Sequence, residues 1–393
     1  MVFRGGSGSA WCLALLFGWV VASAPAQGGV LGVAAGEAAA DARPLLWANF
    51  DGPASDRVVL ALDDGAVPYF ALCAAGDPQR VDAGANTKGL VAAGLAWAPP
   101  SGGGVAEGEG EAKDYASFTK QALQRCATVA EFAELLGAAS CPLPNGAFVV
   151  LDGAGAAAAL VVVAGNVQRM DAAAAPNGRL VFAGDGAAGA RQLRAAAVLA
   201  APQATPLSAR YLLQQMVRDV KAPPDAAKGE RGLVDVRAAV HATNTVAGFV
   251  GCGVKAGDDP RWTSLWALLG PPLLVPGVPL WPIAGAVPRA VAGDPRSAFG
   301  TACEPLVAQV YTPGDGRDGA PDRWLRQDVM ARFRRSVLFG EADLIARVDE
   351  AVAAWRVGAA EPVPATLRAF QERAAKLALD GLVQLGTPQA AGK

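Results

Sequence analysis

The sequence is poor in charge and in histidine, and these shortages exclude several classes of function. Only 18% of the 393 residues are charged, with 34 basic and 36 acidic side chains, and lysine and arginine form no cluster. Nucleic acids and anionic membrane surfaces are disfavoured as partners, since both require concentrated positive charge. His241 is the single histidine, so a multi-histidine metal site is excluded. Because a P-loop and a strand-following GxGxxG are also missing, we expect neither metal nor cofactor.

Long apolar runs are missing as well, apart from one near the N-terminus. Residues 10–22, AWCLALLFGWVVA, follow Arg4 and precede small residues that run to Ala26. This pattern is typical of an export signal, because the apolar run is too short to span a membrane comfortably. We therefore expect residues 1–26 to form a signal peptide cleaved near Ala26, and the mature chain to be periplasmic or extracellular. An uncleaved anchor is the alternative.

Cysteine is scarce and no CxxC occurs, so a zinc knuckle is not indicated. One of the six cysteines leaves with the signal peptide, and the five that remain are Cys73, Cys126, Cys141, Cys252 and Cys303. In an exported protein some of these can pair, although one must stay odd. Proximity along the chain suggests Cys126 with Cys141, and Cys252 with Cys303.

What is present is apolar sequence that alternates between extended and helical patterns. Hydrophobic residues make up 52% of the chain, which is enough for a sizeable core. Strands are predicted at 43–51, 57–64, 67–74, 87–98, 146–153, 157–165, 179–186, 244–254 and 261–270. Helices are predicted at 114–126, 128–138, 190–201 and 208–220. Thr128 and Glu131 have the spacing of a capping box, and Gly137 is expected to end that helix.

The C-terminal third differs in composition. The proline-rich segment 271–288 can form neither a regular helix nor a central strand. From Arg323 onward three runs have helical periodicity; we expect them to pack on the body of the protein, with partner binding as the alternative. The order of elements indicates an α+β fold, most simply a layered αββα sandwich, rather than a Rossmann alternation. We divide the chain into a signal peptide (1–26), a sandwich domain (27–322) and a helical extension (323–393).

Three segments in order resemble one family. RPLLWANFD (43–51), NTKGLVAAGLAW (86–97) and RCATVAEFAELL (125–136) are similar to elements of the N-terminal-nucleophile linear amide hydrolases. This group includes the choloylglycine and penicillin V hydrolases and isopenicillin-N acyltransferase. The resemblance extends over roughly residues 30–290, and it implies an αββα fold and an ancestry in amide hydrolysis.

The family mechanism, as the resemblance implies it, requires a cysteine at the head of the mature chain. The thiolate attacks the amide carbonyl while its own α-amino group acts as the base. Here that position falls at or near Gly29, and no Cys, Ser or Thr occurs from Ala24 to Ala54. The basic residue that follows in the family corresponds to Ala48. The oxyanion donors correspond to Ala96 and Gly184.

Some family positions do keep their polar residues. Asn49, Asp51, Asn86 and Arg210 match the pattern and are candidate remnants of a pocket. Asp51 is equally well explained as a structural carboxylate at a strand end, and Arg210 as a helix-surface ion-pair residue. Outside the motifs, His241 is best explained as a capping or packing residue at a helix end. Cys73 is best explained as an inert buried thiol.

These observations support a main hypothesis and two alternatives. The main one is a catalytically degenerate, exported member of the family that retains at most a binding role for a partner or a small acyl-amide-like ligand. The first alternative is a working amidase or acyltransferase with an unrecognised nucleophile. The second is a structural envelope protein whose C-terminal helices dock a partner.

Overall fold

The computed structural model describes residues 28–52, 57–97, 114–139, 143–184, 189–221, 232–293, 296–313, 323–358 and 361–387. The expected signal peptide and Cys141 lie outside these ranges. No helix in the described ranges is both long and apolar enough to traverse a bilayer.

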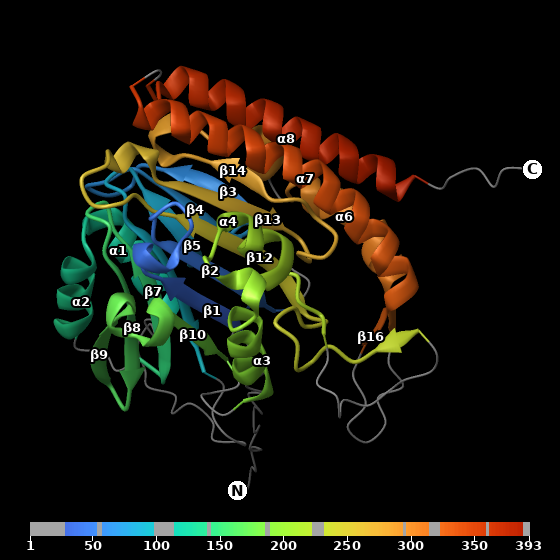
Figure 1. The fold of residues 1–393 in the computed structure, drawn as a ribbon, viewed down its shortest axis with the longest axis horizontal. Helices are drawn as coiled ribbons and strands as arrows, with labels where there is room; N and C mark the ends of the chain where they lie inside the picture. Colours follow the sequence, from blue (N-terminus) through green and yellow to red (C-terminus); the bar gives the residue numbers. More distant parts are fainter. Residues whose placement is uncertain are drawn as a thin grey trace, which may run out of the picture.

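Two large antiparallel sheets form the centre of the protein (Figure 1). The first has the order β10-β1-β2-β12-β13-β14 and the second runs in chain order from β3 to β9. The strands of the first sheet are β1 Gly29–Ala34, β2 Leu45–Asp51, β10 Arg179–Ala183, β12 Thr245–Cys252, β13 Ser264–Leu269 and β14 Val278–Leu280. Those of the second are β3 Arg57–Leu62, β4 Tyr69–Ala74, β5 Val81–Asn86, β6 Val91–Ala96, β7 Gly146–Leu151, β8 Ala157–Val163 and β9 Asn166–Asp171. A small third sheet contains β11 Leu233–Val234, β15 Tyr311–Pro313 and β16 Arg323–Arg326.

The second sheet is buried on both faces, and alternation along β7 shows what covers each of them. Ala147, Val149 and Leu151 belong to the core shared with the first sheet, whereas Phe148 and Val150 pack in a separate cluster against the neighbouring helices. These helices are α1 Tyr115–Arg125 and α2 Val129–Gly137. The predicted capping box and the helix end at Gly137 are both confirmed.

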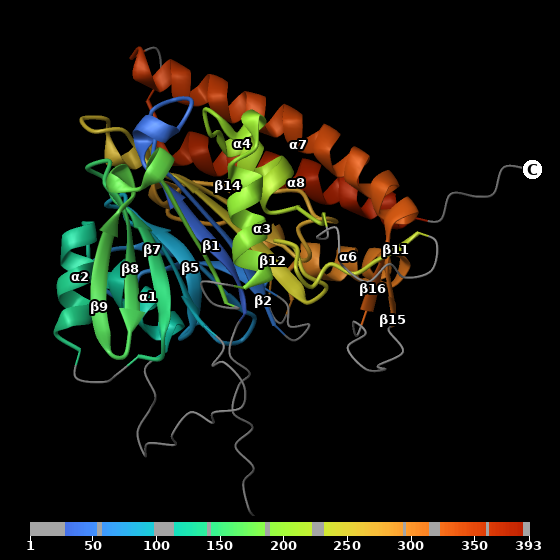
Figure 2. The same ribbon diagram turned by 60° about the horizontal axis from the view of Figure 1, so that its bottom comes forward.

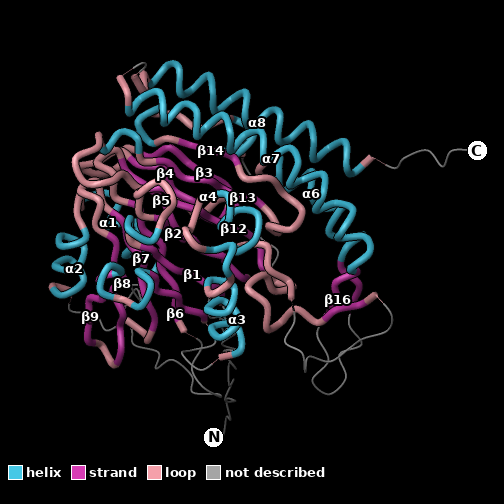
Figure 3. Tube along the Cα trace, in the orientation of Figure 1, coloured by secondary structure: helices cyan, strands magenta, loops and turns pink. Residues whose placement is uncertain are grey.

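Helices also cover the other side of the first sheet. They are α3 Ala190–Leu199, α4 Ala209–Tyr211, α6 Ala298–Val310, α7 Gln327–Arg356 and α8 Pro364–Gly386, with the short α5 Arg289–Ala292 beside β3. In Figures 1 and 3, α7 and α8 run alongside each other, and Figure 2 shows α3 beside β1 and β2. The layers therefore succeed each other as helix, sheet, sheet and helix, and the expected mixed α+β fold is confirmed.

Two segments differ from their predicted form. The helix expected at 208–220 is the three-residue α4 followed by a π-helical turn, Leu212–Met216, in which the Val217 N–H donates to the Leu212 carbonyl at 3.0 Å. The three helical runs expected after Arg323 are strand β16, one 30-residue helix α7, and α8. Both α7 and α8 contribute residues to the hydrophobic cluster that fills the space between the sheets.

The proline-rich segment behaves as its composition requires. Pro279 lies in β14, a three-residue strand at the edge of the first sheet. Because the strand is at the edge, the missing N–H of proline removes no hydrogen bond between central strands.

The proposed disulfide between Cys252 and Cys303 is wrong, because both cysteines are buried and no bond joins them. The other proposed pairing, Cys126 with Cys141, involves a residue outside the described ranges. Cys252 ends strand β12, and Cys303 lies in α6, where its thiol donates to the Gly300 carbonyl at 3.2 Å. The two thiols stay apart even though both belong to the large hydrophobic cluster.

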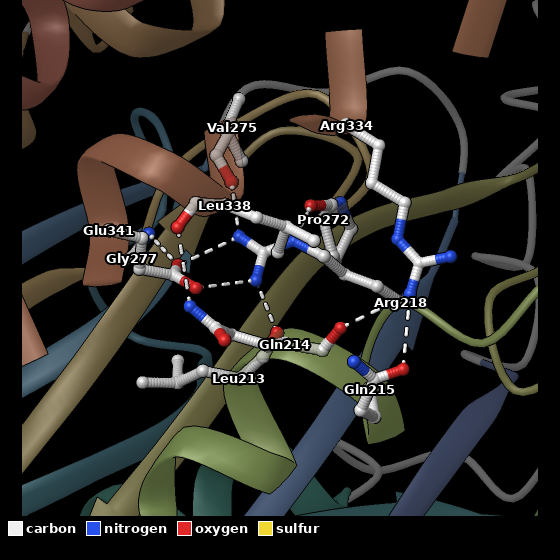
Figure 4. Close-up of polar contacts among 10 residues, drawn as sticks. All are labelled: Leu213, Gln214, Gln215, Arg218, Pro272, Val275, Gly277, Arg334, Leu338 and Glu341. Atoms are coloured by element: carbon white, nitrogen blue, oxygen red, sulfur yellow. Dashed lines mark hydrogen bonds and ion pairs between the residues drawn. The ribbon is translucent and has the colours of Figure 1, made fainter. Parts of the chain in front are cut away.

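A fully buried ion pair attaches α7 to the rest of the protein (Figure 4). The two terminal nitrogens of Arg218 donate to the two carboxylate oxygens of Glu341, each at 2.8 Å, and both side chains are 0% exposed. Glu341 Oε1 also accepts the N–H of Gly277 at 2.8 Å. The remaining donors of Arg218 are bound by the carbonyls of Leu213, Pro272 and Val275. Because every charge and donor of the pair is matched, its desolvation is compensated only while both partners are present.

Removing one member of this pair should strongly destabilise the protein. For Glu341→Gln we expect the free energy of unfolding to fall by about 3–5 kcal/mol, because Arg218 would keep its buried charge without a counterion. Urea unfolding followed by circular dichroism measures this change.

Arg347→Gln is the matched control in the same helix. Arg347 pairs with Asp343 at 2.8 Å, but the two side chains are 60% and 52% exposed, so solvent screens the pair and the loss should be much smaller than in Glu341→Gln. Equal losses in the two variants would contradict the role given to the buried pair.

Candidate functional site

The end of strand β2 carries the best-preserved polar residues of the family pattern. Side chains alternate along a strand, so Asn49 and Asp51 share one face of β2 while Ala48 lies on the other. Asn49 donates from Nδ2 to the carbonyls of Val217 at 2.9 Å and Val240 at 3.2 Å. Its Oδ1 is buried without a hydrogen-bond partner among the described residues. Asn49 therefore ties β2 to the segments that cover it.

Asp51 is the centre of a buried polar cluster. Its side chain is 3% exposed and forms an ion pair with Arg191 of α3, whose Nη2 lies 3.4 Å from Oδ1 and whose Nη1 contacts Oδ2. The hydroxyl of Thr245 donates to Oδ1 at 2.7 Å. Arg191 also donates to the carbonyls of Ala239 at 3.1 Å and Val240 at 2.8 Å. The carboxylate is thus neutralised by a cation of α3, whereas the family pattern places a basic residue at position 48, on β2 itself.

Three glycines lie together beside the end of β2, and one of them, Gly28, approaches this carboxylate. The Asp51 N–H donates to the Gly28 carbonyl at 3.0 Å, and the Gly184 N–H donates to the Gly29 carbonyl at 2.9 Å. A Cβ added at Gly28 would lie 3.2 Å from Asp51 Oδ2, whereas one added at Gly29 would lie 2.2 Å from the Asn49 carbonyl oxygen. Gly29 also has φ +152°, which L side chains rarely adopt. Of the two neighbours, Gly28 is the position from which a side chain would reach Asp51.

Two of the other family positions do not provide the expected groups. Ala48 is fully buried and stands opposite Leu31 and Phe249 on the adjacent strands. Ala96 packs against the cluster beneath α1 and α2, on the opposite face of β6 from Leu95, which approaches Gly29. A side chain at position 96 would therefore point away from the glycines.

The two remaining candidates, Asn86 and Arg210, lie away from Asp51. Asn86 closes the β5–β6 hairpin: its Nδ2 donates to the carbonyls of Leu123 and Cys126, and its Oδ1 accepts the N–H groups of Lys88 and Leu90. Arg210 is exposed and lines a groove with Asp349 and Leu45, at the opposite end of β2 from Asp51. Neither residue joins the cluster.

No activated thiol is found among the described residues. Burial raises the pKa of Cys73 to about 12 and the pKa of both Cys126 and Cys252 to about 11. These thiols remain protonated at neutral pH, and a protonated thiol is a poor nucleophile. The interpretation of Cys73 as a buried thiol agrees with this environment.

The hydroxyl of Thr245 is hydrogen-bonded to the Asp51 carboxylate. It donates to Asp51 and accepts the Ala242 N–H at 2.9 Å, so both of its roles are satisfied by the protein. The carboxylate that accepts its proton is itself held in an ion pair with Arg191, whereas a hydroxyl needs an available general base to become a nucleophile.

His241 is buried rather than placed at a helix end. It lies in the turn before β12, its backbone N–H donates to the Asp219 carbonyl at 2.9 Å, and its Nε2 is 2.7 Å from the Tyr311 hydroxyl. Burial, with smaller contributions from Arg191 and Arg218, lowers the pKa of His241 to about 3. The ring is therefore neutral at physiological pH and packs inside the protein. The predicted helix end is wrong, because the segment forms turns.

Arg191 and Thr245 are the site residues that the sequence does not reveal. Arg191 lies 140 positions from Asp51 and Thr245 lies 194 positions from it. Neither belongs to a motif. In the described part of the chain, no group of three or more His, Cys, Asp or Glu side chains is arranged to bind a metal ion.

Comparisons with known proteins add similarity of fold. Models of protein families give no match, and a search of curated proteins finds none. Among solved structures, penicillin V acylase from Agrobacterium tumefaciens is 14% identical with a TM-score of 0.40, over 64% of this chain and 85% of that one. An N-acylethanolamine-hydrolyzing acid amidase from Caenorhabditis elegans is 12% identical with a TM-score of 0.39, over 56% and 91%. A variant of conjugated bile acid hydrolase from Clostridium perfringens is 15% identical with a TM-score of 0.27, over 38% and 52%. The structural neighbours are thus amide hydrolases, at identities and scores too low to carry an argument about activity.

The ion pair at Asp51 should hold α3 on the first sheet. In Arg191→Met the buried carboxylate would keep only the Thr245 hydroxyl, so the amide hydrogens of residues 190–199 should exchange at least about tenfold faster. Hydrogen–deuterium exchange with mass spectrometry measures this, and peptides from α8 serve as the internal reference. Arg169→Met, which removes an exposed ion pair with Asp171, is the control variant. Unchanged protection of α3 would show that packing alone holds the helix.

The single histidine gives the protein a defined pH dependence. A histidine whose folded-state pKa lies below its unfolded value stabilises the protein fully above about pH 6.5, and this stability is lost as the pH falls toward the folded value of about 3. Between pH 7 and pH 5 the free energy of unfolding should fall by about 2 kcal/mol.

The variant His241→Asn isolates this effect. Whatever its absolute stability, its free energy of unfolding should change little between pH 7 and pH 5, because the group that takes up the proton in the unfolded state is gone. Urea unfolding at a series of pH values tests both proteins. Parallel curves for the two would refute the assignment.

Proposed function

We propose that the protein is an exported, non-hydrolytic relative of the linear amide hydrolases that retains at most a binding role for a small acyl-amide-like ligand or a partner. The single observation that carries the proposal is the cluster at Asp51. Its carboxylate is neutralised by Arg191 and accepts a hydrogen bond from Thr245, and the neighbouring Gly28, Gly29 and Gly184 carry no side chain.

Amide hydrolysis by the family route needs three chemical parts, and each is missing here. Gly28 and Gly29 have no side chain, so neither provides a sulfur or oxygen atom to act as the nucleophile. Ala48 and Ala96 have no polar group with which to position a nucleophile or stabilise an oxyanion. The Gly184 N–H already donates to the Gly29 carbonyl. Loss of the nucleophile alone lowers the rate of such an enzyme by several orders of magnitude.

The proposal of ancestry depends on the ordered motifs of the sequence, with Asn49 and Asp51 as its polar anchors. Export depends on the signal-like pattern of residues 1–26. Mass spectrometry of the secreted protein tests export directly. A mature chain that begins with Cys, Ser or Thr would restore an N-terminal nucleophile and overturn the proposal.

The mature protein should not cleave acyl amides. Penicillin V, N-acylethanolamines, conjugated bile acids and N-acyl amino acids are suitable substrates, with product release followed by mass spectrometry. We expect no turnover above the uncatalysed background, whereas a working enzyme would show a kcat of about 1 s⁻¹ or more. Turnover that a thiol or hydroxyl blocker abolishes would instead support the alternative of an unrecognised nucleophile.

Matched cysteine variants separate the missing nucleophile from the other losses. Gly28→Cys should destabilise the protein less than Gly29→Cys, because a Cβ at position 28 would lie 3.2 Å from the Asp51 carboxylate, whereas one at position 29 would lie 2.2 Å from the Asn49 carbonyl oxygen. Neither should acquire amidase activity while Ala48 and Ala96 remain. Appreciable turnover by either single variant would show that the nucleophile was the only functional loss.

A further inference from the structure

A second groove lies outside the Asp51 cluster, between α3, the segment around Tyr211 and the first turns of α7. Its volume is about 610 Å³, which is within the usual size range of small-molecule sites. Asp51 does not line it. Arg194, Asp219, Lys221 and Arg334 provide its charged groups, so the lining carries an excess of positive charge.

The acidic groups near this groove are already occupied. Asp219 uses both of its oxygens to accept from Arg194, with the Nε–Oδ2 distance at 2.8 Å. Glu341, which lies behind the groove, uses both oxygens on Arg218. Neither carboxylate remains available as a counterion for a further cation.

Arg334 is the cation without a counterion. Its Nη2 donates to two neutral acceptors, the Gln214 carbonyl at 3.3 Å and Gln215 Oε1 at 3.2 Å, and its other terminal nitrogen points away from both (Figure 4). Its Nε is buried and has no hydrogen-bond partner. No carboxylate of the described residues forms an ion pair with it. Burial and the nearby Arg218 lower the pKa of Arg334, and the Asp219 carboxylate opposes this shift only in part.

Apolar side chains form one part of the groove wall, beside its polar groups. Val198 of α3 and Met330 of α7 are 7% and 5% exposed, and Leu325 and Val234 complete the apolar surface. The Tyr211 hydroxyl is satisfied by the Val198 carbonyl at 2.7 Å, so it presents mainly its ring. A ligand that fits both features has an apolar body and one anionic end. Arg334 is half-buried, whereas Lys221, the other cation of the lining outside the Arg194–Asp219 pair, is exposed to solvent. One guanidinium beside the apolar side chains matches one negative charge, which favours a carboxylate over a doubly charged phosphate.

We propose that this groove binds an organic monoanion, with its carboxylate on Arg334 and its apolar body against Val198 and Met330. The site is separate from the Asp51 cluster and requires no hydrolysis. This binding proposal is tested by measuring ligand affinity, whereas the proposed function is tested by measuring product formation. Failure of one can therefore be distinguished from failure of the other.

Octanoate is a suitable probe, and octanamide is its uncharged counterpart. By isothermal titration calorimetry on the full mature chain, octanoate should bind at least about tenfold more tightly than octanamide, because only the carboxylate pairs with Arg334. Affinity should rise roughly threefold for each added methylene from hexanoate to octanoate. Equal binding of octanoate and octanamide, or no binding of octanoate up to about 10 mM, would overturn the proposal.

The variant Arg334→Gln should weaken octanoate binding at least about tenfold and leave octanamide binding unchanged. Arg335→Gln, which removes an exposed arginine at the next position of the same helix, should bind octanoate as the unmodified protein does. Circular dichroism establishes that both variants are folded, and the ratio of octanoate to octanamide affinity remains informative even if Arg334→Gln is less stable. A folded Arg334→Gln that binds octanoate normally would refute the site, as would inorganic phosphate that competes as well as octanoate does.

Discussion

The ion pair between Arg218 and Glu341 determines how the C-terminal helices join the sheets. Its two side chains are completely buried, and its hydrogen bonds extend to the π-helical turn, to the loop after β13 and to Gly277 before β14. A charge in this position is stable only if α7, the π-helical turn and the loop between β13 and β14 meet at once. Helix α7 is therefore attached by a directional contact as well as by apolar burial, and the side chains of α7 and α8 can complete the core that begins between the two sheets.

The same logic applies to the cluster at Asp51, with a different result for function. A carboxylate at a strand end can position a nucleophile, or it can hold a helix on a sheet. Here Arg191 and Thr245 use its oxygens, and Asn49 uses its amide to bind two backbone carbonyls. The contacts of Asn49 and Asp51 are thus accounted for by packing.

Local chemistry determined which features the sequence could predict. The capping box of α2 depends on Thr128 and Glu131 alone, and the edge position of Pro279 depends on its missing N–H, so both could be inferred without a structure. The groups around Asp51 could not, because Arg191 and Thr245 contact it across long stretches of chain. The pairing of Cys252 with Cys303 was wrong because closeness in sequence does not establish that two thiols meet in the fold. A periodic apolar pattern also cannot distinguish an α-helix from a π-helical turn, so the form of 212–216 was missed.

That π-helical turn has a consequence for how the chain could vary in evolution. The turn accommodates about one more residue than a turn of α-helix. Two anchoring residues follow it directly: Val217, whose carbonyl accepts a hydrogen bond from Asn49, and Arg218, which pairs with Glu341. Deleting one residue from 212–216 would restore ordinary helix and rotate everything after it by about 100° about the axis. The Val217 carbonyl and the Arg218 side chain would then both point away from their partners, Asn49 and Glu341. Side chains in this stretch can be exchanged, but its residue count is fixed, so insertions and deletions among descendants of this chain should be absent there.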